Sequence, residues 1–248
     1  MSDTIDALLA ERKTLLEICA RLGAADWASG SGCPGWSVQD VVSHMGAGFQ
    51  ALVDPSALPD VQGLPFEEAQ DVIVRARRGL SPAEVVAHYT ETSEKAIGAL
   101  RDLSVADFEV PLGDAGTYPA SALPAGYCFD HYIHIRGDLF APRGPLPGPR
   151  PASDGLRLGG AIDWIEAAVG QQNADRLAAL DSPAEIVLSG GDSRTLRLGP
   201  DGPPVATVRS HADDFVYWVT QRATWEDLGV EASGDENALA VLRGLRVF

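Results

Sequence analysis

The residues best suited to chemistry are concentrated in two short segments. The first, CPGWSVQDVVSHM at positions 33–45, contains His44, and the second, FDHYIHIRGDL at positions 129–139, contains Asp130 and His134. On an α-helix, two residues four positions apart lie one above the other on the same face. Imidazole and carboxylate groups that converge on one point can bind a divalent metal. The spacing therefore predicts a metal site between two helices, with His44, Asp130 and His134 as ligands.

Three protein ligands would leave coordination positions open for water or substrate, as in catalytic metal sites. Asp138 or His131 would then hold an imidazole in one tautomer or bind the substrate. An ordinary interpretation fits the same residues: His44 would be a hydrogen-bonded histidine between helices, and Asp130 and His134 a surface pair. The pattern alone leaves both interpretations open.

The elements that must position these residues are helical over the first part of the chain. Ser37 and Asp40 are spaced as a capping box, and Ser81-Pro82 are typical of an N-cap followed by the first helical residue. Apolar residues at a helical period predict helices over 3–22, 38–52, 66–78, 82–100 and 124–140. This part of the chain is expected to form a helical bundle.

The pattern changes after a proline-rich segment at 141–151, which is expected to be a linker. Helices are predicted over 154–180, 212–222 and 236–245, and β-strands over 184–190, 194–200 and 204–210. Gly190, Gly191 and Asp192 indicate a hairpin between the first two strands. The predicted fold class is α+β, with a helical bundle at 1–150 and a small α+β domain at 151–248.

The composition excludes several classes of partner. A formal charge of −16 argues against nucleic acid and anionic membranes, which both attract clustered Lys and Arg. The first twenty residues contain charges instead of an apolar signal-peptide core, and no later run is long enough to span a bilayer. We therefore expect a cytoplasmic protein that binds neither nucleic acid nor membrane.

The cysteines and the tryptophan of the first segment are given structural interpretations. Cys19, Cys33 and Cys128 are too few and too scattered for a disulfide framework or a zinc knuckle. Cys33 is interpreted as a structural residue before the turn, because no neighbour in sequence would lower the pKa of its thiol. Trp36 is expected to be a core residue that anchors the turn to the bundle.

These motifs resemble those of the mycothiol-dependent maleylpyruvate isomerase family, within the DinB-like superfamily of metal-binding four-helix bundles. CPGWSVQDVVSHM resembles the signature CPGW-T/S-V-x-D-V-V-x-H-L over its whole length. FDHYIHIRGDL resembles a second signature, a carboxylate followed four residues later by His and then by an acid. The tail, from VRSHADDFVYWVTQR to GDENALAVL, is similar to the family's sterol-carrier-like C-terminal domain. The resemblance covers nearly the whole chain.

The resemblance implies zinc or another divalent metal on His44, Asp130 and His134, and mycothiol as a thiol cosubstrate. Arg222 stands at the position of an arginine common in the family, and the resemblance implies that it binds a substrate carboxylate. One of Arg75 and Arg77 is a further candidate for that contact, with solvated helix arginines as the alternative for both.

The chain departs from the family pattern at two positions. The family usually has Glu where this chain has Asp130, and its trailing acid usually follows the histidine by three residues, whereas Asp138 follows His134 by four.

The expected function is a metal- and thiol-dependent isomerase or transferase that acts on a small electrophilic or acidic molecule. Two alternatives remain open: a non-enzymatic protein that binds a metal and a small molecule, and a metal-dependent hydrolase in which water replaces the thiol. The sequence leaves the oligomeric state open between monomer and homodimer.

Overall fold

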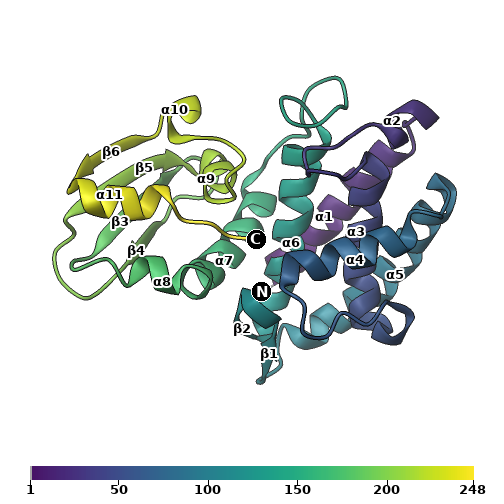
Figure 1. Ribbon diagram of the computed structural model, residues 1–248, viewed down its shortest axis with the longest axis horizontal. Helices are drawn as coiled ribbons and strands as arrows, with labels where there is room; N and C mark the ends of the chain where they lie inside the picture. The colour runs from purple at the N-terminus through teal and green to yellow at the C-terminus, as the bar shows by residue number, and fades with distance from the viewer. Residues whose placement is uncertain (1) are drawn as a thin grey trace.

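The chain folds into a helical part followed by a part built on a four-stranded sheet, which confirms the α+β fold class (Figure 1). The computed structural model describes residues 2–248. Its helices are α1 (Ser2–Cys19), α2 (Ala24–Ala28), α3 (Val38–Val53), α4 (Phe66–Arg77), α5 (Pro82–Leu103), α6 (Leu123–Ile133), α7 (Gly155–Gln172), α8 (Ala174–Leu177), α9 (Ala212–Val219), α10 (Trp225–Leu228) and α11 (Glu236–Arg243). Its strands are β1 (Glu109–Pro111), β2 (Thr117–Pro119), β3 (Ala184–Ser189), β4 (Thr195–Leu198), β5 (Ala206–His211) and β6 (Glu231–Gly234). Short 3₁₀ turns η1 (Pro55–Ala57), η2 (Gly113–Ala115) and η3 (Ala120–Ala122) connect these elements, and α6 continues directly into a π-helical turn, η4 (His134–Leu139).

The helical part is organised around α3 and α5, which pack along each other, while α1 packs along α6. The predicted cap of α3 is present: the Ser37 hydroxyl accepts from the Asp40 N–H at 3.1 Å, and the Asp40 carboxylate accepts from the Ser37 N–H at 3.0 Å. Helix α5 begins in the same way at Ser81, with Pro82 as its first residue. Both caps fix where a site-bearing or supporting helix begins.

Helix α6 lies between two hydrophobic cores. Leu123 at its start packs in the core of the bundle, whereas Phe129, Tyr132 and Ile133 pack in a second core with α7 and the sheet. Helix α7 in turn contacts α1 and α6 on one side and α9 on the other. The segment that carries Asp130 and the residues after it therefore lies at the junction of the two parts.

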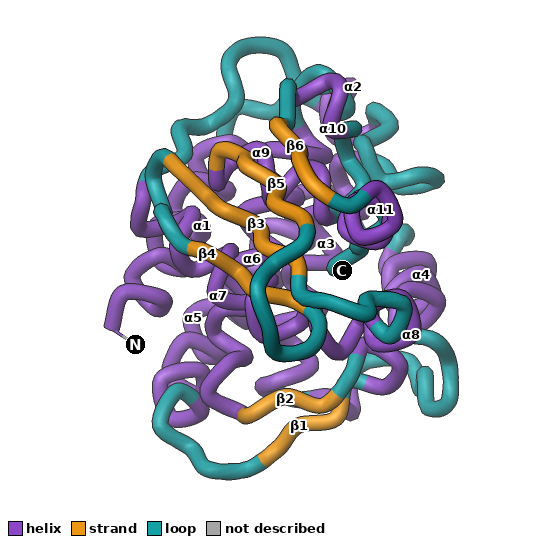
Figure 2. The backbone as a smooth tube through the Cα atoms, turned by 90° about the vertical axis from the view of Figure 1, so that its left-hand side faces the viewer, coloured by secondary structure: helices purple, strands orange, loops and turns teal. Residues whose placement is uncertain are grey.

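The sheet has the strand order β4-β3-β5-β6 and is shown from its outer side in Figure 2. Strands β3 and β4 form the predicted antiparallel hairpin, β3 and β5 are parallel, and β5 and β6 are antiparallel. Ala184, Ile186 and Leu188 of β3 are buried, as the alternating pattern predicts for a strand with one face on a core. After α11 the chain returns to the helical part, so that the C-terminus lies at the junction (Figure 1).

Several predicted boundaries were wrong. The helix predicted over 124–140 is α-helical only to Ile133, the helix over 212–222 ends at Val219, and the helix over 154–180 is divided into α7 and α8. The β1–β2 hairpin and strand β6 were not predicted, because β1 and β2 are three residues each and β6, EASG, is exposed along its length. The domain boundary at residue 150 stays a prediction.

The segment 141–151 is packed against the bundle. Leu146 is buried, and its N–H donates to the Leu139 carbonyl at 2.9 Å. This segment is therefore a loop that returns to the end of η4, and not the free linker that its prolines suggested. No helix in the described part of the chain, residues 2–248, is both long and apolar enough to cross a membrane.

Candidate metal centre

The three predicted metal ligands come together where α3 faces the end of α6 and the start of η4. Nε2 of His44 lies 3.0 Å from Oδ1 of Asp130, and Nε2 of His134 lies 3.4 Å from the same oxygen. One donor atom from each residue lies within 4.8 Å of the other two. The helices therefore place two imidazole nitrogens and one carboxylate oxygen at one point, although the sequence separates His44 from Asp130 by 86 residues.

The turn before α3 is built by its proline and glycine. The Cys33 carbonyl accepts from the Trp36 N–H at 3.1 Å, and Gly35 has a φ of +78°. Proline in the second position and a residue with positive φ in the third are the requirements of a type II turn, which Pro34 and Gly35 meet. The turn ends at the N-cap of α3, and so it fixes where Cys33 and Trp36 lie relative to the ligands.

Trp36 packs against the core of the bundle, as predicted for an anchor of the turn, and it also forms a wall of the site. Its side chain is half-buried, and its indole N–H donates to Asp71 of α4 at 2.7 Å. The ring centroid lies 5.1 Å from that of His44 and 6.5 Å from that of His134. The tryptophan therefore confines both imidazoles while linking the turn to α4.

The second ring nitrogen of His134 is held by Asp138. Nδ1 donates to Oδ2 of Asp138 at 2.9 Å, and Asp138 is fully buried. The π-helical turn η4, in which each hydrogen bond spans one residue more than in an α-helix, places an acid four residues after the histidine beneath its ring. Because Nδ1 carries one proton, Nε2 is the nitrogen that faces Asp130, where it can hold a second proton or bind a cation.

Arg222 completes this arrangement from the C-terminal part. Its Nε donates to Oδ1 of Asp138 at 3.1 Å, and its Nη2 donates to Oδ2 at 2.6 Å, as in a two-pronged guanidinium–carboxylate pair. Arg222 is brought there by the end of α9, where Gln221 has a φ of +57° and the Arg222 N–H donates to the Tyr217 carbonyl at 2.8 Å. This is the Schellman geometry, and it ends α9 without the usual glycine.

The electrostatics on the Nε2 side of His134 favour a bound positive charge. Burial alone would raise the pKa of Asp130, but His44 and His134 hold it well below its ordinary value. Burial would likewise lower the pKa of His134, but Cys33, Asp130 and the hydrogen bonds to Asp130 and Asp138 raise it well above its ordinary value. A carboxylate beside two imidazole nitrogens therefore retains its charge, and a proton or a cation must stand between them.

A second group of potential ligands lies on the other side of the ring. Cys33, His134 and Asp138 also have donor atoms within 4.8 Å of one another, and the Cys33 sulfur lies 3.7 Å from Nδ1 of His134. Here the carboxylate is already neutralised by Arg222, and Nε of Arg143 lies 3.8 Å from Oδ1 of Asp138. A metal ion at this point would face two guanidinium groups, so the geometry disfavours it.

The ligands open on a cavity of about 620 Å³ at the junction of the two parts, which we call the site cavity. Its lining comes from the CPGW turn, α3, the start of α4, α6, His134 of η4, Arg143, residues 220–222 and the C-terminal residues 246–248. A volume of this size is typical of small-molecule sites.

Of the residues predicted to contact substrate, only Arg222 lines the site cavity. Arg75 is exposed and pairs with Asp71, and Arg77 lies behind α3, where it donates to Ser43 at 3.0 Å. Arg222 uses Nε and Nη2 for Asp138, so a direct contact with substrate stays a prediction that depends on Nη1.

His131 is excluded from the site by its own hydrogen bonds. Its Nδ1 bonds to the Tyr127 carbonyl at 2.8 Å and its Nε2 to the Tyr89 hydroxyl at 2.9 Å. The ring is fully buried, and burial lowers its pKa to about 4, so it is neutral at ordinary pH. Asp138 and His131 were the two candidates for a residue that orients an imidazole. Asp138 contacts His134 in this way, whereas His131 is held in the core by Tyr127 and Tyr89.

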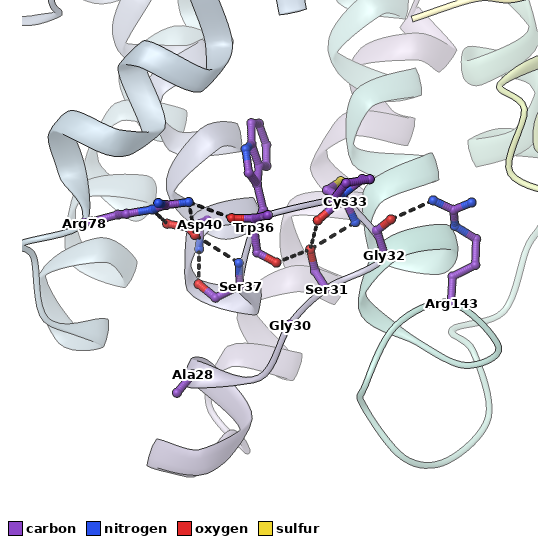
Figure 3. Close-up of a pocket in the computed structure, with 12 residues that line it drawn as sticks. Ala28, Gly30, Ser31, Gly32, Cys33, Trp36, Ser37, Asp40, Arg78 and Arg143 are labelled. Carbon is purple, nitrogen blue, oxygen red and sulfur yellow. Dashed lines mark hydrogen bonds and ion pairs between the residues drawn. The ribbon is translucent and has the colours of Figure 1, made fainter. Parts of the chain in front are cut away.

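A second, more open cavity of about 580 Å³ lies on the outer face of the CPGW turn (Figure 3). Arg143 donates to the Gly32 carbonyl at 2.6 Å, and Arg78 donates to the Gly35 carbonyl at 2.7 Å, so that the two guanidinium groups hold the turn from opposite ends. Cys33 and Trp36 line both cavities. The turn is therefore a thin partition between the site cavity and the surface.

Two glycines that support the site were not identified from the sequence. A Cβ on Gly32 would lie 2.8 Å from Oδ1 of Asp138, and a Cβ on Gly137 would lie 3.1 Å from Cδ of Arg222. Gly137 interrupts a helical pattern, which is a signal of close approach by another part of the chain. Gly32, within a Gly/Ser-rich loop, gave no comparable signal.

Comparisons with known proteins agree with the resemblance noted in the sequence. The family model described as the mycothiol maleylpyruvate isomerase N-terminal domain matches residues 8–136. Two solved structures are similar over 94% of this chain and 93% of theirs with a TM-score of 0.62: a mycothiol-dependent maleylpyruvate isomerase, 16% identical, and a histidine-to-alanine mutant of such an enzyme, 15% identical. A comparison with curated proteins finds no match. At these identities the structures show the shared fold, and the family model spans just over half of the 248 residues. The chain therefore belongs to the mycothiol-dependent maleylpyruvate isomerase family.

Proposed function

We propose that the chain is a metal-dependent enzyme that uses mycothiol to isomerise, or to transfer a group to or from, a small electrophilic or acidic molecule. The observation that carries this proposal is the convergence of Nε2 of His44, Oδ1 of Asp130 and Nε2 of His134 beside the site cavity. Membership of the family and the names of the two similar structures support mycothiol as the cosubstrate.

The residues present fit a divalent metal ion. Two imidazole nitrogens and one carboxylate are ligands that zinc accepts, and three protein ligands leave further positions open. His44 makes its single hydrogen bond through Nε2, and its buried Nδ1 has no partner among the described residues. Asp130 is shorter than the glutamate usual in the family, and it still reaches both histidines. We propose zinc or another divalent ion on these three residues.

The chain's own residues would prepare the site for a thiol. A bound divalent ion lowers the pKa of a coordinated thiol, so that the nucleophilic thiolate is present near neutral pH. Asp138 holds the proton of His134 on Nδ1 and thereby directs the lone pair of Nε2 toward the site. Arg222 neutralises Asp138, which stabilises that carboxylate in its buried position. In this proposal Arg222 acts through Asp138.

The walls of the site cavity would protect the reacting groups from water. Trp36, Phe129 and Ile133 cover it next to the ligands, and Phe66 and Phe248, whose rings lie 6.0 Å apart, cover it where α4 meets the C-terminus. Exclusion of water strengthens the electrostatic interactions inside a site and prevents competing hydrolysis. An electrophile bound there would therefore be attacked by the thiolate in preference to water.

The first test is metal analysis of protein purified without a polyhistidine tag. About one divalent ion per chain is expected in the wild type, since the ligands form one site. His134→Ala is expected to lose it, and His211→Ala, which removes an exposed histidine outside the site, is expected to retain it. Absence of metal from the wild type after incubation with zinc would contradict the proposal.

The second test is the dependence of turnover on the thiol. The metal-loaded protein is expected to convert an activated alkene only when mycothiol is present, because the thiol is the nucleophile. Turnover of an ester or amide without thiol would instead indicate the metal-dependent hydrolase. Metal binding without turnover of either kind would favour a protein that only binds its ligands.

A further inference from the structure

The charged residues around the site cavity leave little positive charge for an anionic substrate. Three arginines line the cavity, and each is already engaged: Arg222 with Asp138, Arg143 with the Gly32 carbonyl at 2.6 Å, and Arg246 with Glu67 at 2.5 Å. The Arg222 pair is the strongest of these, because Asp138 is fully buried and bound by two nitrogens. A substrate carboxylate would have to share a guanidinium group with one of these partners, for example through the remaining Nη1 of Arg222.

Acidic residues of α4 also line the cavity, and one of them, Glu67, is the partner of Arg246. Glu67, Glu68 and Asp71 all project from α4 into its lining, and Asp130 adds a fourth carboxylate at the ligands. With Asp138 behind Arg222, these acids outnumber the three arginines, so a bound divalent ion would bring the cavity close to neutrality. The chain as a whole carries −16 and repels dianions at longer range.

The rest of the lining is apolar. Trp36, Phe66, Phe129, Ile133 and Phe248 surround the space between the ligands and the acids of α4. Aromatic and aliphatic walls favour a substrate with apolar groups, because burial of such groups contributes about 25 cal/mol per Å². Transfer of an unpaired carboxylate into the same walls is unfavourable.

Resting on the function proposed above, we infer that the electrophile accepted by this site is uncharged and partly apolar, such as an activated alkene with ester or ketone groups, and not a dicarboxylate. In the isomerisation, the thiolate sulfur forms a bond to one alkene carbon and the π electron pair moves to the carbonyl oxygen of the substrate. Rotation about the resulting single bond follows. The electron pair then returns, the carbon–sulfur bond breaks, and the thiolate leaves, so the thiol is regenerated and nothing is oxidised or reduced.

The test compares two substrates with the same double bond, maleate and its dimethyl ester. The metal-loaded full chain is supplied with mycothiol, and conversion of each cis isomer to the trans isomer is followed by NMR. Each rate is divided by the rate with mycothiol alone, which removes the difference in intrinsic reactivity. We expect the acceleration of the diester to exceed that of the diacid by about tenfold or more, because two like unit charges about 12 Å apart repel by the equivalent of about tenfold at an effective dielectric constant of 20.

A charge variant gives an independent measure. Glu68→Arg reverses a charge in the cavity lining, and we expect it to reduce the preference for the diester by about tenfold. The matched control is Glu94→Arg, on α5 and outside the cavity, which should leave the preference unchanged.

The outcomes separate this inference from the function on which it rests. Equal or greater acceleration of the diacid would overturn the inference and leave the thiol-dependent enzyme in place. A shift of the preference by Glu94→Arg as large as that by Glu68→Arg would also overturn it, because the effect would then come from the net charge of the protein. If neither substrate were accelerated, both the inference and the proposed function would be overturned.

Discussion

On the cavity side of His134, Nε2 faces Asp130 and His44, and no arginine forms an ion pair with Asp130 in the described part of the chain. On the buried side, Nδ1 faces Asp138, which Arg222 already neutralises. The two carboxylates are both four residues from the histidine and look equivalent in the sequence. They differ in their surroundings, and that difference distinguishes a position for a cation from a position that orients the ring.

The largest expected effect is on metal affinity. Asp130→Asn removes a ligand charge, and we expect zinc affinity, measured by competition with a chelator, to fall by more than about 100-fold, which is beyond the range for residues that only orient a ligand. Asp138→Asn should cost about 10- to 100-fold, because it loosens the ring of His134 without removing a ligand. Equal losses in the two variants would contradict the distinction.

The free energy of unfolding should show the opposite order, with a larger loss for Asp138→Asn than for Asp130→Asn. Asp138→Asn leaves Arg222, whose side chain is 16% exposed, without its carboxylate, and breaking such a buried pair costs about 3–5 kcal/mol. The free energy of unfolding in urea, measured on metal-free protein, tests this. Arg222→Met combined with Asp138→Asn removes both partners and should recover part of the loss. A double variant no more stable than Asp138→Asn alone would show that the pair is not the cause.

His131 and His134 should also differ in how they respond to pH. The pKa of His131 is lowered to about 4 by burial, below the value of about 6.5 expected in the unfolded chain. Its contribution to stability is therefore complete above about pH 6.5 and is lost as the pH falls toward 4, at a total of up to about 3 kcal/mol.

The measurement compares metal-free wild type with His131→Gln from pH 7 to pH 4. The wild type should lose more stability than the variant over this range, since only the wild type must protonate a buried imidazole. Parallel curves for the two proteins would mean that His131 is not held in its neutral form.

The smallest effect expected is at the glycines before the turn. Gly32→Ala would place a methyl group 2.8 Å from Oδ1 of Asp138, and overpacking of this kind costs about 1–3 kcal/mol. Gly30→Ala is the matched control, because a Cβ there meets no atom within 4 Å and should change stability by no more than about 0.5 kcal/mol. Thermal unfolding of both variants measures the difference. Equal changes would show that the turn does not approach Asp138 closely.

The convergence of His44, Asp130 and His134 could be predicted because much of the information about it is local. A helical period places Asp130 and His134 on one face, and a capping box sets where the helix of His44 begins. His44 lies beside Val41 and Met45 at the edge of the apolar face of its predicted helix, and this position and the family resemblance indicated that helix as the partner. The helices of the bundle were predicted for the same reason, since their periods are long and regular.

The surroundings of Asp138 could not be predicted, because they depend on contacts between distant segments. The π-helical turn that places Asp138 under His134 has no clear signature in HIRGDL, and Arg222 reaches it from 84 residues away. The early end of α9 was missed because Gln221 takes the left-handed conformation in place of a glycine. Strand β6, EASG, was missed because its residues have little preference for strands, and its backbone pairing with β5 stabilises it instead.

The central claim is that a metal ion binds on the Nε2 side of His134, and anomalous diffraction from zinc-loaded crystals, recorded at the zinc absorption edge, tests it most directly. We predict one peak about 2.0–2.2 Å from Nε2 of His44, a carboxylate oxygen of Asp130 and Nε2 of His134, with Arg222 still paired to Asp138. A peak bonded to the Cys33 sulfur and Nδ1 of His134, or no peak near either group, would contradict the account.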